Sequence, residues 1–458
     1  MRDTAKHAPS RREFLKHTGR VTAATTLAGM AVPHVHAAED NTLQVALVGC
    51  GGRGTGAAAD ALSVTRGPVK LVAMADVFED RVKGSFNNLK GRFGDRVDAP
   101  EDRQFSGFDA YKKAMDCLKP GGIAIFASPP AFRWAHFACA VEKGLHVFME
   151  KPLTADGPTS RRMLDLGKKA AEKNLKVGVG LMSRHARNLQ QLNQRVRDGE
   201  IGDLITMRAY RMHGPIGSAF TEKWPGSPSE LLWQIRRFHA FIWASGGCYN
   251  DFYIHVIDHC CWMKDAWPVK AQALGGRHYR GEWVDQNFDS YAVEYTFADG
   301  AKLFLNGRCM PGAHTNFSSA LHGSKGCAVG SRSGDCGAPS STYEGQDFDK
   351  ARQIWQSEIP AGETNPYQNE WNDLVGAIRD DKPYSEVEHG VMASVVSSLG
   401  RKAAHTAKEI TLDEMLNSPD EYAPGLDQWT ADSPAPVQAD ADGKYPVPMP
   451  GIITDREY

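Results

Sequence analysis

The chain has 458 residues, which is enough for two or three domains with hydrophobic cores of their own. Its 53 Lys and Arg against 55 Asp and Glu give a formal charge of −2, so we expect neither nucleic acid nor an anionic membrane as a partner. No stretch approaches the roughly 18 consecutive apolar residues of a membrane span. The 41% hydrophobic content and 45 glycines are typical of a soluble α/β protein.

The first 37 residues have the pattern of a twin-arginine export signal. Residues 10–16 read Ser-Arg-Arg-Glu-Phe-Leu-Lys, a short apolar stretch follows over 21–32, and Val35-His36-Ala37 offers small residues for cleavage. We therefore predict a signal peptide over residues 1–37 and a periplasmic mature protein. This export route carries proteins already folded, often with their cofactor inside.

Nine cysteines are irregularly spaced and odd in number, which indicates neither a disulfide framework nor a zinc site. We expect no bound metal. The pair Cys260-Cys261 falls in an apolar run and is predicted to be buried.

A glycine-rich turn follows the first predicted strand, 43–48, and opens onto an alanine-rich helix that ends near Leu62. The spacing is Gly-x-Gly-x-x-Gly, in which the glycines allow a tight turn, close approach of a pyrophosphate and close helix–strand packing. The helix N-terminus supplies free N–H groups for phosphate. The residues predicted to bind the cofactor here are Gly49, Gly51, Gly52, Arg53 and Gly54.

A carboxylate ends the second predicted strand, 69–75. Asp76 stands 22 residues after Gly54, where an acidic side chain binds ribose hydroxyls and repels a 2′-phosphate. This favours NAD over NADP, although Arg53 and Arg81 leave NADP open.

Two more strands end in residues predicted to face the cofactor. The strand 123–127 leads into Ser128-Pro129-Pro130 and a helix that carries His136. Residues 141–149 then supply a strand that stops at Glu150-Lys151-Pro152, because proline cannot continue a ladder. Ligands bind at the carboxyl ends of such strands, so Lys151 is expected at a crevice.

The second half is predicted to contain a largely antiparallel sheet, with strands at 204–210, 269–275, 290–297 and 301–307. A helix over 251–263 is apolar nearly all round, yet Asp251, His255 and Asp258 fall on one stripe of it. Buried polar groups need partners or a cavity, so we interpret the stripe as catalytic.

Aromatic residues alternate with Arg and His over 233–243, a composition that suits contact with a sugar or, equally, a core or interface. The residues predicted to bind substrate are Arg184, Trp233, Arg236, Asp251 and His255.

Taken together, the glycine turn, Asp76, Ser128-Pro129-Pro130 with His136, and Glu150-Lys151-Pro152 resemble the Gfo/Idh/MocA oxidoreductase family. The resemblance implies an N-terminal Rossmann dinucleotide-binding domain, 43–152, and a C-terminal α/β domain, 153–415, with an open, mostly antiparallel sheet that packs on another subunit. It implies that Lys151, Asp251 and His255 are catalytic. Residues 418–458 are rich in Pro, Asp and Ala and are predicted to lie extended on the surface or on a neighbouring subunit.

These features predict an exported NAD(P)-dependent oxidoreductase that acts on a sugar, cyclitol or glycoside. Because no free nicotinamide pool exists outside the cytoplasm, we expect a tightly held cofactor that is recycled in place. One alternative is an NAD-dependent glycosidase that acts by transient oxidation and elimination. Another is a sugar-binding protein that keeps the cofactor only as structure.

Overall fold

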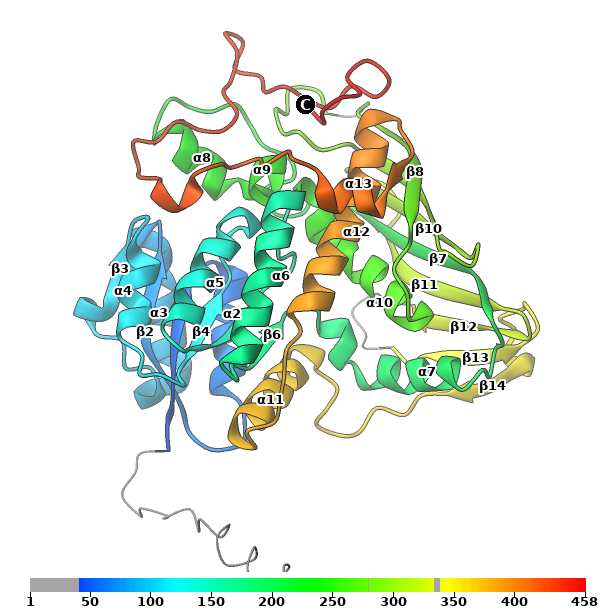
Figure 1. Ribbon diagram of the computed structural model, residues 1–458, viewed down its shortest axis with the longest axis horizontal. Helices are drawn as coiled ribbons and strands as arrows, with labels where there is room; N and C mark the ends of the chain where they lie inside the picture. The colour runs from blue at the N-terminus through cyan, green and yellow to red at the C-terminus, as the bar shows by residue number, and fades with distance from the viewer. Residues whose placement is uncertain (1–40, 279, 333–337) are drawn as a thin grey trace, which may run out of the picture. The chain divides into compact units, whose positions relative to one another are not determined.

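The computed structural model describes residues 41–278, 280–332 and 338–458, so the predicted signal peptide at 1–37 lies outside the described residues. Residues 42–458 form one compact unit that contains two β-sheets and the helices packed on them (Figure 1). Among the described residues, no helix is both long and apolar enough to cross a bilayer.

The first sheet has six parallel strands in the order β3-β2-β1-β4-β5-β6. The order reverses direction between β1 and β4, which is the place where doubly wound sheets open a crevice for ligands. β6 follows residue 152 and still pairs in this sheet. The strands are β1 (Leu43–Val48), β2 (Val69–Asp76), β3 (Gln104–Ser106), β4 (Ile123–Phe126), β5 (His146–Met149) and β6 (Val177–Val179).

Both faces of this sheet are covered, which explains why its strands are apolar without alternation. One face packs on α2, α3 and α11, through residues such as Leu47, Ile125 and Trp371. The other face packs on α4, α5 and α6, through residues such as Val48 and Phe126. The helices are α2 (Gly52–Leu62), α3 (Glu79–Phe93), α4 (Ala110–Asp116), α5 (Arg133–Glu142), α6 (Gly157–Glu172) and α11 (Pro366–Arg379).

The second sheet has nine strands in the order β14-β13-β12-β11-β7-β10-β9-β8-β15. All its neighbours are antiparallel except β7 and β10, so the predicted mostly antiparallel sheet is confirmed. The four strands from β11 to β14 are not among those that the sequence predicts. The strands are β7 (Leu204–His213), β8 (Lys270–Gly276), β9 (Ser290–Thr296), β10 (Lys302–Cys309), β11 (Asn316–Gly323), β12 (Gly326–Ser331), β13 (Ser341–Glu344), β14 (Gln353–Gln356) and β15 (Ile410–Thr411).

Helices α10 and α12 pack on the inner face of this sheet, against side chains such as Met207 and Leu303. The outer face carries exposed apolar side chains, among them Ile205 and Leu274. The alternation of buried and exposed positions along β9 and β10 follows from this one-sided cover. The remaining helices are α7 (Arg187–Arg197), α8 (Glu230–Arg236), α9 (Ile242–Ser245), α10 (Ile254–Lys264), α12 (Val387–Thr406) and α13 (Leu412–Asn417).

Three short helical segments matter for the site: the 3₁₀ segments η4 (Met182–His185) and η5 (Phe238–Ala240), and η6 (Tyr249–Tyr253), a π-turn. The predicted helix over 251–263 therefore begins earlier, with η6, and continues as α10. The predicted strand within 141–149 is also corrected, because residues up to Glu142 finish α5 and β5 begins at His146.

The C-terminal segment 418–458 lies extended along its own chain (red in Figure 1). Its apolar side chains join a core cluster formed with α5, α8 and α9, so the segment is packed against these helices instead of lying free on the surface. The buried members from this segment are Ala423, Leu426, Ala435, Val437 and Tyr445.

Candidate active site

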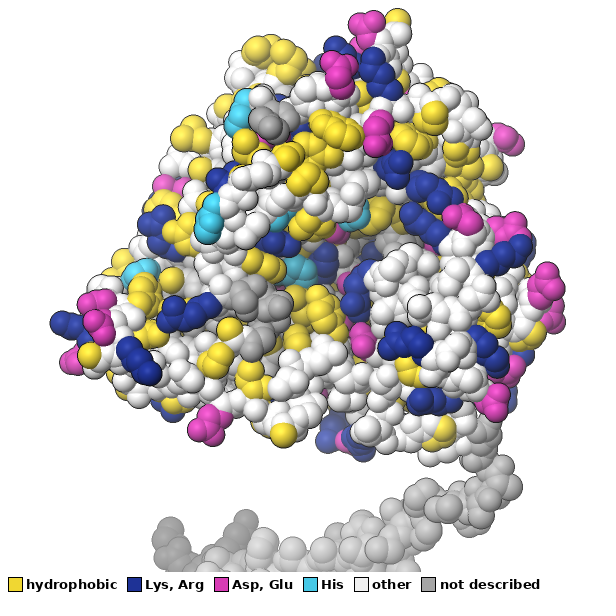
Figure 2. All heavy atoms as spheres, turned by 180° about the vertical axis from the view of Figure 1, so that it is seen from behind, with side chains coloured by type: hydrophobic (Ala, Val, Ile, Leu, Met, Phe, Trp, Pro, Cys, Tyr) yellow, Lys and Arg dark blue, Asp and Glu magenta, His cyan; other side chains and the backbone are white. Residues whose placement is uncertain are grey.

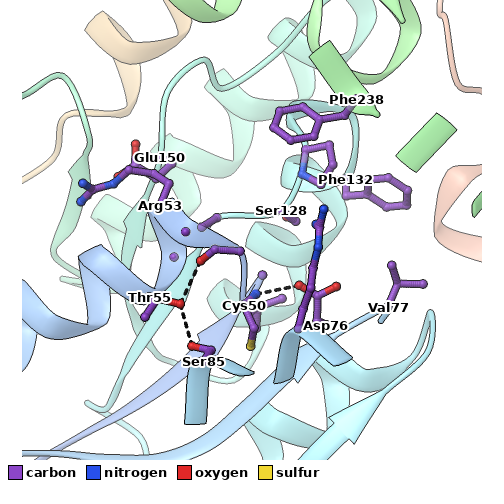
Figure 3. Close-up of a pocket in the computed structure, with 18 of the residues that line it drawn as sticks. Cys50, Arg53, Thr55, Asp76, Val77, Ser85, Ser128, Phe132, Glu150 and Phe238 are labelled. Carbon is purple, nitrogen blue, oxygen red and sulfur yellow. Dashed lines mark hydrogen bonds and ion pairs between the residues drawn. The ribbon is translucent and has the colours of Figure 1, made fainter. Parts of the chain in front are cut away.

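A cavity of about 970 Å³ opens at the carboxyl ends of β1, β2, β4 and β5, where the strand order reverses. Its volume is at the upper end of the roughly 300–1,000 Å³ that cofactor and small-molecule sites occupy. Figure 3 shows its walls, with Thr55 and Ser85 on one side and Phe132 and Phe238 away from them. All the residues predicted to bind cofactor line it: Gly49, Gly51, Gly52, Arg53, Gly54, Asp76, Ser128, Pro129, His136, Glu150 and Lys151.

The glycine turn has the geometry that a dinucleotide site needs. Gly49 has φ +97°, and a Cβ on it would lie 2.5 Å from the carbonyl carbon of Ala127. A Cβ on Gly54 would lie 1.9 Å from the Gly49 oxygen, whereas one on Gly51 would meet nothing within 4 Å. Gly51 is the N-cap of α2, so the first N–H groups of this helix border open space that suits a phosphate.

Asp76 stands at the end of β2 and is only 8% exposed. Its carboxylate accepts a hydrogen bond from the backbone N–H of Cys50 at 2.7 Å (Figure 3). The backbone N–H of Phe78 donates a second one at 3.0 Å. Burial raises the pKa of Asp76, while these N–H groups and the nearby Arg81 act against that rise. The carboxylate is thus fixed beside the glycine turn, with lone pairs left for ribose hydroxyls.

Arg53 points away from Asp76 and toward Glu150 (Figure 3). Its Nε donates to Glu150 Oε1 at 2.6 Å, and its guanidinium lies 4.6 Å from the ring centroid of Tyr367. Arg53 is therefore paired with Glu150, at the end of β5, whereas Arg81 lies near enough to Asp76 to lower its pKa.

The loop after β4 is held by a side chain that the sequence did not single out. Arg133 is 1% exposed, lines the cavity and donates from Nη2 to the backbone oxygen of Ser128 at 2.6 Å. Ser128 Oγ in turn lies 3.1 Å from His136 Nδ1. Burial, followed by the charge of Arg133, lowers the pKa of His136 to about 3, so this imidazole is neutral and works as a fixed part of the wall.

Lys151 and Asp251 meet in the cavity, although 100 residues separate them. Lys151 Nζ donates to the backbone oxygen of Asp251 at 2.7 Å and lies 3.6 Å from its Oδ2. His239 Nε2 lies 3.3 Å from the same oxygen. Burial alone would raise the pKa of Asp251, but Lys151 and His239 outweigh it and hold the pKa below its usual value.

His255 lines the cavity one turn beyond Asp251, and its Nδ1 is buried without a hydrogen-bond partner. Burial, then the charges of Lys151 and Arg211, lower the pKa of His255 well below 6.5. A neutral imidazole at this place can accept a proton but would not keep it.

Three residues predicted to bind substrate do not line the cavity, so the structure does not bring them together with Asp251 and His255. Arg184 forms a bidentate pair with Asp258 at 2.8 and 2.9 Å, because the fully buried Asp258 needs a cation. The predicted polar stripe is therefore divided, with only Asp251 and His255 at the cavity.

The other two belong to α8. Trp233 is 9% exposed and packs under Arg237, whose guanidinium is 4.5 Å from its ring centroid. Arg236 donates to both carboxylate oxygens of Asp80, at 2.8 and 3.0 Å, and covers Phe78. Ile235, Phe238 and His239 from the same stretch face the cavity instead.

Sequence reasoning also missed His239 and Arg133 as parts of the site. His239 lies in the aromatic stretch 233–243, but nothing in the local sequence distinguishes it from its neighbours. Arg133 is four residues beyond Pro129, and its contact with Ser128 depends on the turn into α5. In the described ranges, no group of three or more His, Cys, Asp or Glu is arranged to hold a metal.

The face of the molecule shown in Figure 2 mixes both signs of charge. Lys and Arg side chains are interspersed with Asp and Glu over its rim, with histidine and basic side chains nearer its middle. The cations that line the cavity are Arg53, Arg81, Arg92, Arg133 and Lys151.

Part of the chain matches a known protein family. Residues 189–329, which run from α7 through the second sheet to β12, match the family described as the GFO/IDH/MocA C-terminal domain. This segment is similar to the C-terminal domain of that family. The match agrees with the resemblance carried by the N-terminal motifs.

Two curated relatives support the same family. The chain is 26% identical over 142 residues to inositol 2-dehydrogenase of Corynebacterium glutamicum, covering 31% of this chain and 40% of that protein. It is 26% identical over 239 residues to D-glucoside 3-dehydrogenase of Escherichia coli, covering 50% of this chain and 58% of that protein. The aligned regions thus span about half the length of these relatives.

Among solved structures, levoglucosan dehydrogenase in complex with NADH and levoglucosan has a TM-score of 0.61 and 19% identity. The likeness covers 81% of this chain and 99% of that one. It confirms the predicted fold class, an α/β chain with an N-terminal parallel sheet and a C-terminal, mostly antiparallel sheet.

Proposed function

We propose that this chain is an NAD(P)-dependent oxidoreductase that transfers hydride to or from a hydroxyl-bearing carbon of a sugar, cyclitol or glycoside. One observation carries the proposal: Lys151, Asp251 and His255 line the same cavity as the glycine turn and Asp76. The relatives, an inositol and a glucoside dehydrogenase, support the substrate class.

The residues present fit a dinucleotide. The open N-terminus of α2 and the space beside Gly51 would hold the pyrophosphate, and Asp76 would bind the ribose. We favour NAD, because the Asp76 carboxylate repels a 2′-phosphate and Arg53 is already paired with Glu150. Bound there, the nicotinamide would supply the redox chemistry.

The chain's own side chains would manage the proton and the charge. His255 lines the cavity as a neutral imidazole and would take the hydroxyl proton as the alcohol is oxidised. Lys151 would donate a hydrogen bond to the substrate oxygen and stabilise the negative charge that develops on it. Asp251, held ionised beside Lys151, would stabilise the imidazolium of His255.

The test is nucleotide binding followed by turnover of myo-inositol, methyl glucoside and levoglucosan with NAD⁺. Lys151→Met is expected to lower kcat/KM by about 10²–10³-fold, because one charge-stabilising donor is lost, with the Kd for NAD⁺ changed little. Lys168→Met is the matched control, since Lys168 lies on α6 with its side chain 76% exposed.

The outcomes separate the competing functions. Cleavage of an aryl glycoside without NADH accumulation would favour the glycosidase route. Nucleotide binding with no effect of Lys151→Met on any reaction would favour a sugar-binding protein. If no nicotinamide nucleotide binds, the proposal is wrong.

We propose further that the protein is exported with its cofactor held and recycled in place. The support is the sequence Ser10 to Lys16 and the residues that follow it. Cell fractionation of Arg11→Lys/Arg12→Lys would test export, with retention in the cytoplasm expected. Denaturing the exported protein and measuring the mass of any released nucleotide would test retention of the cofactor. If no nucleotide is released, recycling in place is ruled out.

A further inference from the structure

His239 is held by a loop that is shaped around its ring. The segment after β7 places Gly217 at φ +54°, where a Cβ would lie 2.7 Å from both Cε1 and Nδ1 of the imidazole. The next residue, Ser218, donates its backbone N–H to His239 Nδ1 at 3.3 Å and has its Oγ 3.1 Å from the same nitrogen. The backbone N–H of His239 donates back to Ser218 Oγ at 3.3 Å.

These contacts decide which ring nitrogen carries the proton. Because the Ser218 N–H points at Nδ1, Nδ1 is the acceptor and a neutral His239 has its hydrogen on Nε2. Nε2 lies 3.3 Å from Asp251 Oδ2, so this hydrogen is directed at the carboxylate. The ring also stacks on Phe252, with centroids 5.2 Å apart, and its sequence neighbour Phe238 lines the cavity (Figure 3).

We propose that His239 is a positioning residue for the reaction, whose Nε2–H holds the Asp251 carboxylate in place beside Lys151. The inference rests on the proposed function and adds a residue that the family resemblance does not assign. Asp251 would then be oriented from two sides, by Lys151 after β5 and by His239 on η5.

The charged groups around Asp251 come from four elements. Lys151 and His239 contact its carboxylate, His255 lies on α10, and Arg133 on α5 interacts with it at longer range. Arg237 and Glu222 pair with each other at 3.8 Å near the same loop. Removing His239 takes away a direct neighbour of the carboxylate and leaves the ion pair with Lys151, so the pKa of Asp251 is expected to rise toward its ordinary value.

Two substitutions at one position separate hydrogen bonding from packing. His239→Phe keeps a ring to stack on Phe252 but has no donor, whereas His239→Gln keeps an N–H donor. With the best of the three sugar probes, we expect His239→Phe to lower kcat about tenfold. The pKa of Asp251 should also rise, because a carboxylate that loses a donor protonates more readily. His239→Gln should recover much of both effects.

Gly217→Ala gives a second route to the same result, since its Cβ would displace the ring without changing His239. His322→Gln is the control, because His322 lies on β11 of the nine-stranded sheet and forms a hydrogen bond with the side chain of Gln346. An unchanged kcat in both His239→Phe and Gly217→Ala, with folding intact, would overturn the proposal.

A measurement without turnover distinguishes this inference from the proposed function. In ¹⁵N-histidine NMR spectra of the protein with NAD⁺, Nε2 of His239 should carry a hydrogen, and its signal should shift in Asp251→Asn. The Nδ1–H tautomer would refute the positioning role whatever the substrate is. The expected tautomer together with no oxidation of any probe would reject the proposed function alone.

Discussion

At the scale of single residues, the glycines of the turn after β1 meet different needs. Gly54 is required by the folded chain itself, because a Cβ there would strike the Gly49 oxygen at 1.9 Å. Gly51 has open space around it, so its lack of a side chain serves whatever binds there. The turn thus combines one constraint from packing with another from the ligand.

Two alanine substitutions should separate these constraints. Gly54→Ala is expected to lower the free energy of unfolding by about 1–3 kcal/mol, the usual cost of overpacking. Gly51→Ala should leave the unfolding of the nucleotide-free protein nearly unchanged but weaken NAD⁺ binding at least about tenfold, by blocking the pyrophosphate. Denaturant unfolding and calorimetric titration would measure both, and equal losses of stability in the two variants would contradict this assignment.

At the scale of elements, the segment 418–458 is anchored at its end by a buried ion pair. Glu457 accepts hydrogen bonds from Arg401 Nε and Nη2 on α12, each at 2.9 Å, and lies 3.0 Å from His405 Nδ1. The side chains of Arg401 and Glu457 are 0% and 1% exposed. Trp429 from the same segment packs edge-on against Phe132, a wall of the cavity, so the segment supports the site as well as the fold.

Breaking the anchor should be costly, because an unpaired charge would stay buried. Glu457→Ala is expected to destabilise the protein by about 3–5 kcal/mol, measured by denaturant unfolding. Asp455→Ala, at a side chain 77% exposed, is the control and should change stability by less than about 0.5 kcal/mol. Similar effects of the two substitutions would mean that the segment is not anchored by this pair.

The same pair gives the anchor a pH dependence. Burial alone would raise the pKa of Glu457, but Arg401 and His405 hold it below the ordinary 4.5. A carboxyl with a lowered pKa stabilises the fold above its unfolded pKa, and this stabilisation is lost progressively as the pH falls below 4.5. Loss of stability in acid should therefore be smaller in Glu457→Ala than in the unchanged protein.

At the scale of the whole molecule, the two sheets have different surroundings. The parallel sheet is covered on both faces, whereas the outer face of the nine-stranded sheet exposes Leu274 at 78% and Ile205 at 56%. A shallow hollow on this face is lined by side chains of β8, β9 and β10. We propose that this face packs on a second copy of the chain, as the sequence resemblance implied.

Light scattering should then give a mass at least twice that of one mature chain. Leu274→Glu places a charge in the proposed interface and should shift the protein toward monomer, with circular dichroism unchanged. The control is Lys168→Glu, at an exposed position away from this sheet. Lys302→Glu is unsuitable as a control, because Lys302 pairs with Glu294 within the sheet. A monomer before any substitution would contradict the proposal.

The sequence alone determined the features that depend on near neighbours along the chain. The strand, glycine turn and helix from 43 to 62, the carboxylate at Asp76 and the stop at Lys151-Pro152 are local patterns with few physical solutions. The parallel sheet follows from their spacing. All the residues predicted from these motifs to bind cofactor line one cavity, although their roles remain predictions.

Tertiary structure decided whatever depends on partners that are distant in sequence. Arg184 is turned from the cavity by Asp258, 74 residues away, because a buried carboxylate without a cation is too costly. His239 reaches Asp251 only because the loop at Gly217 and Ser218 folds over its ring. Such pairings leave no local pattern, since hydrogen bonds and ion pairs act across space while periodicity and turn chemistry act along the chain.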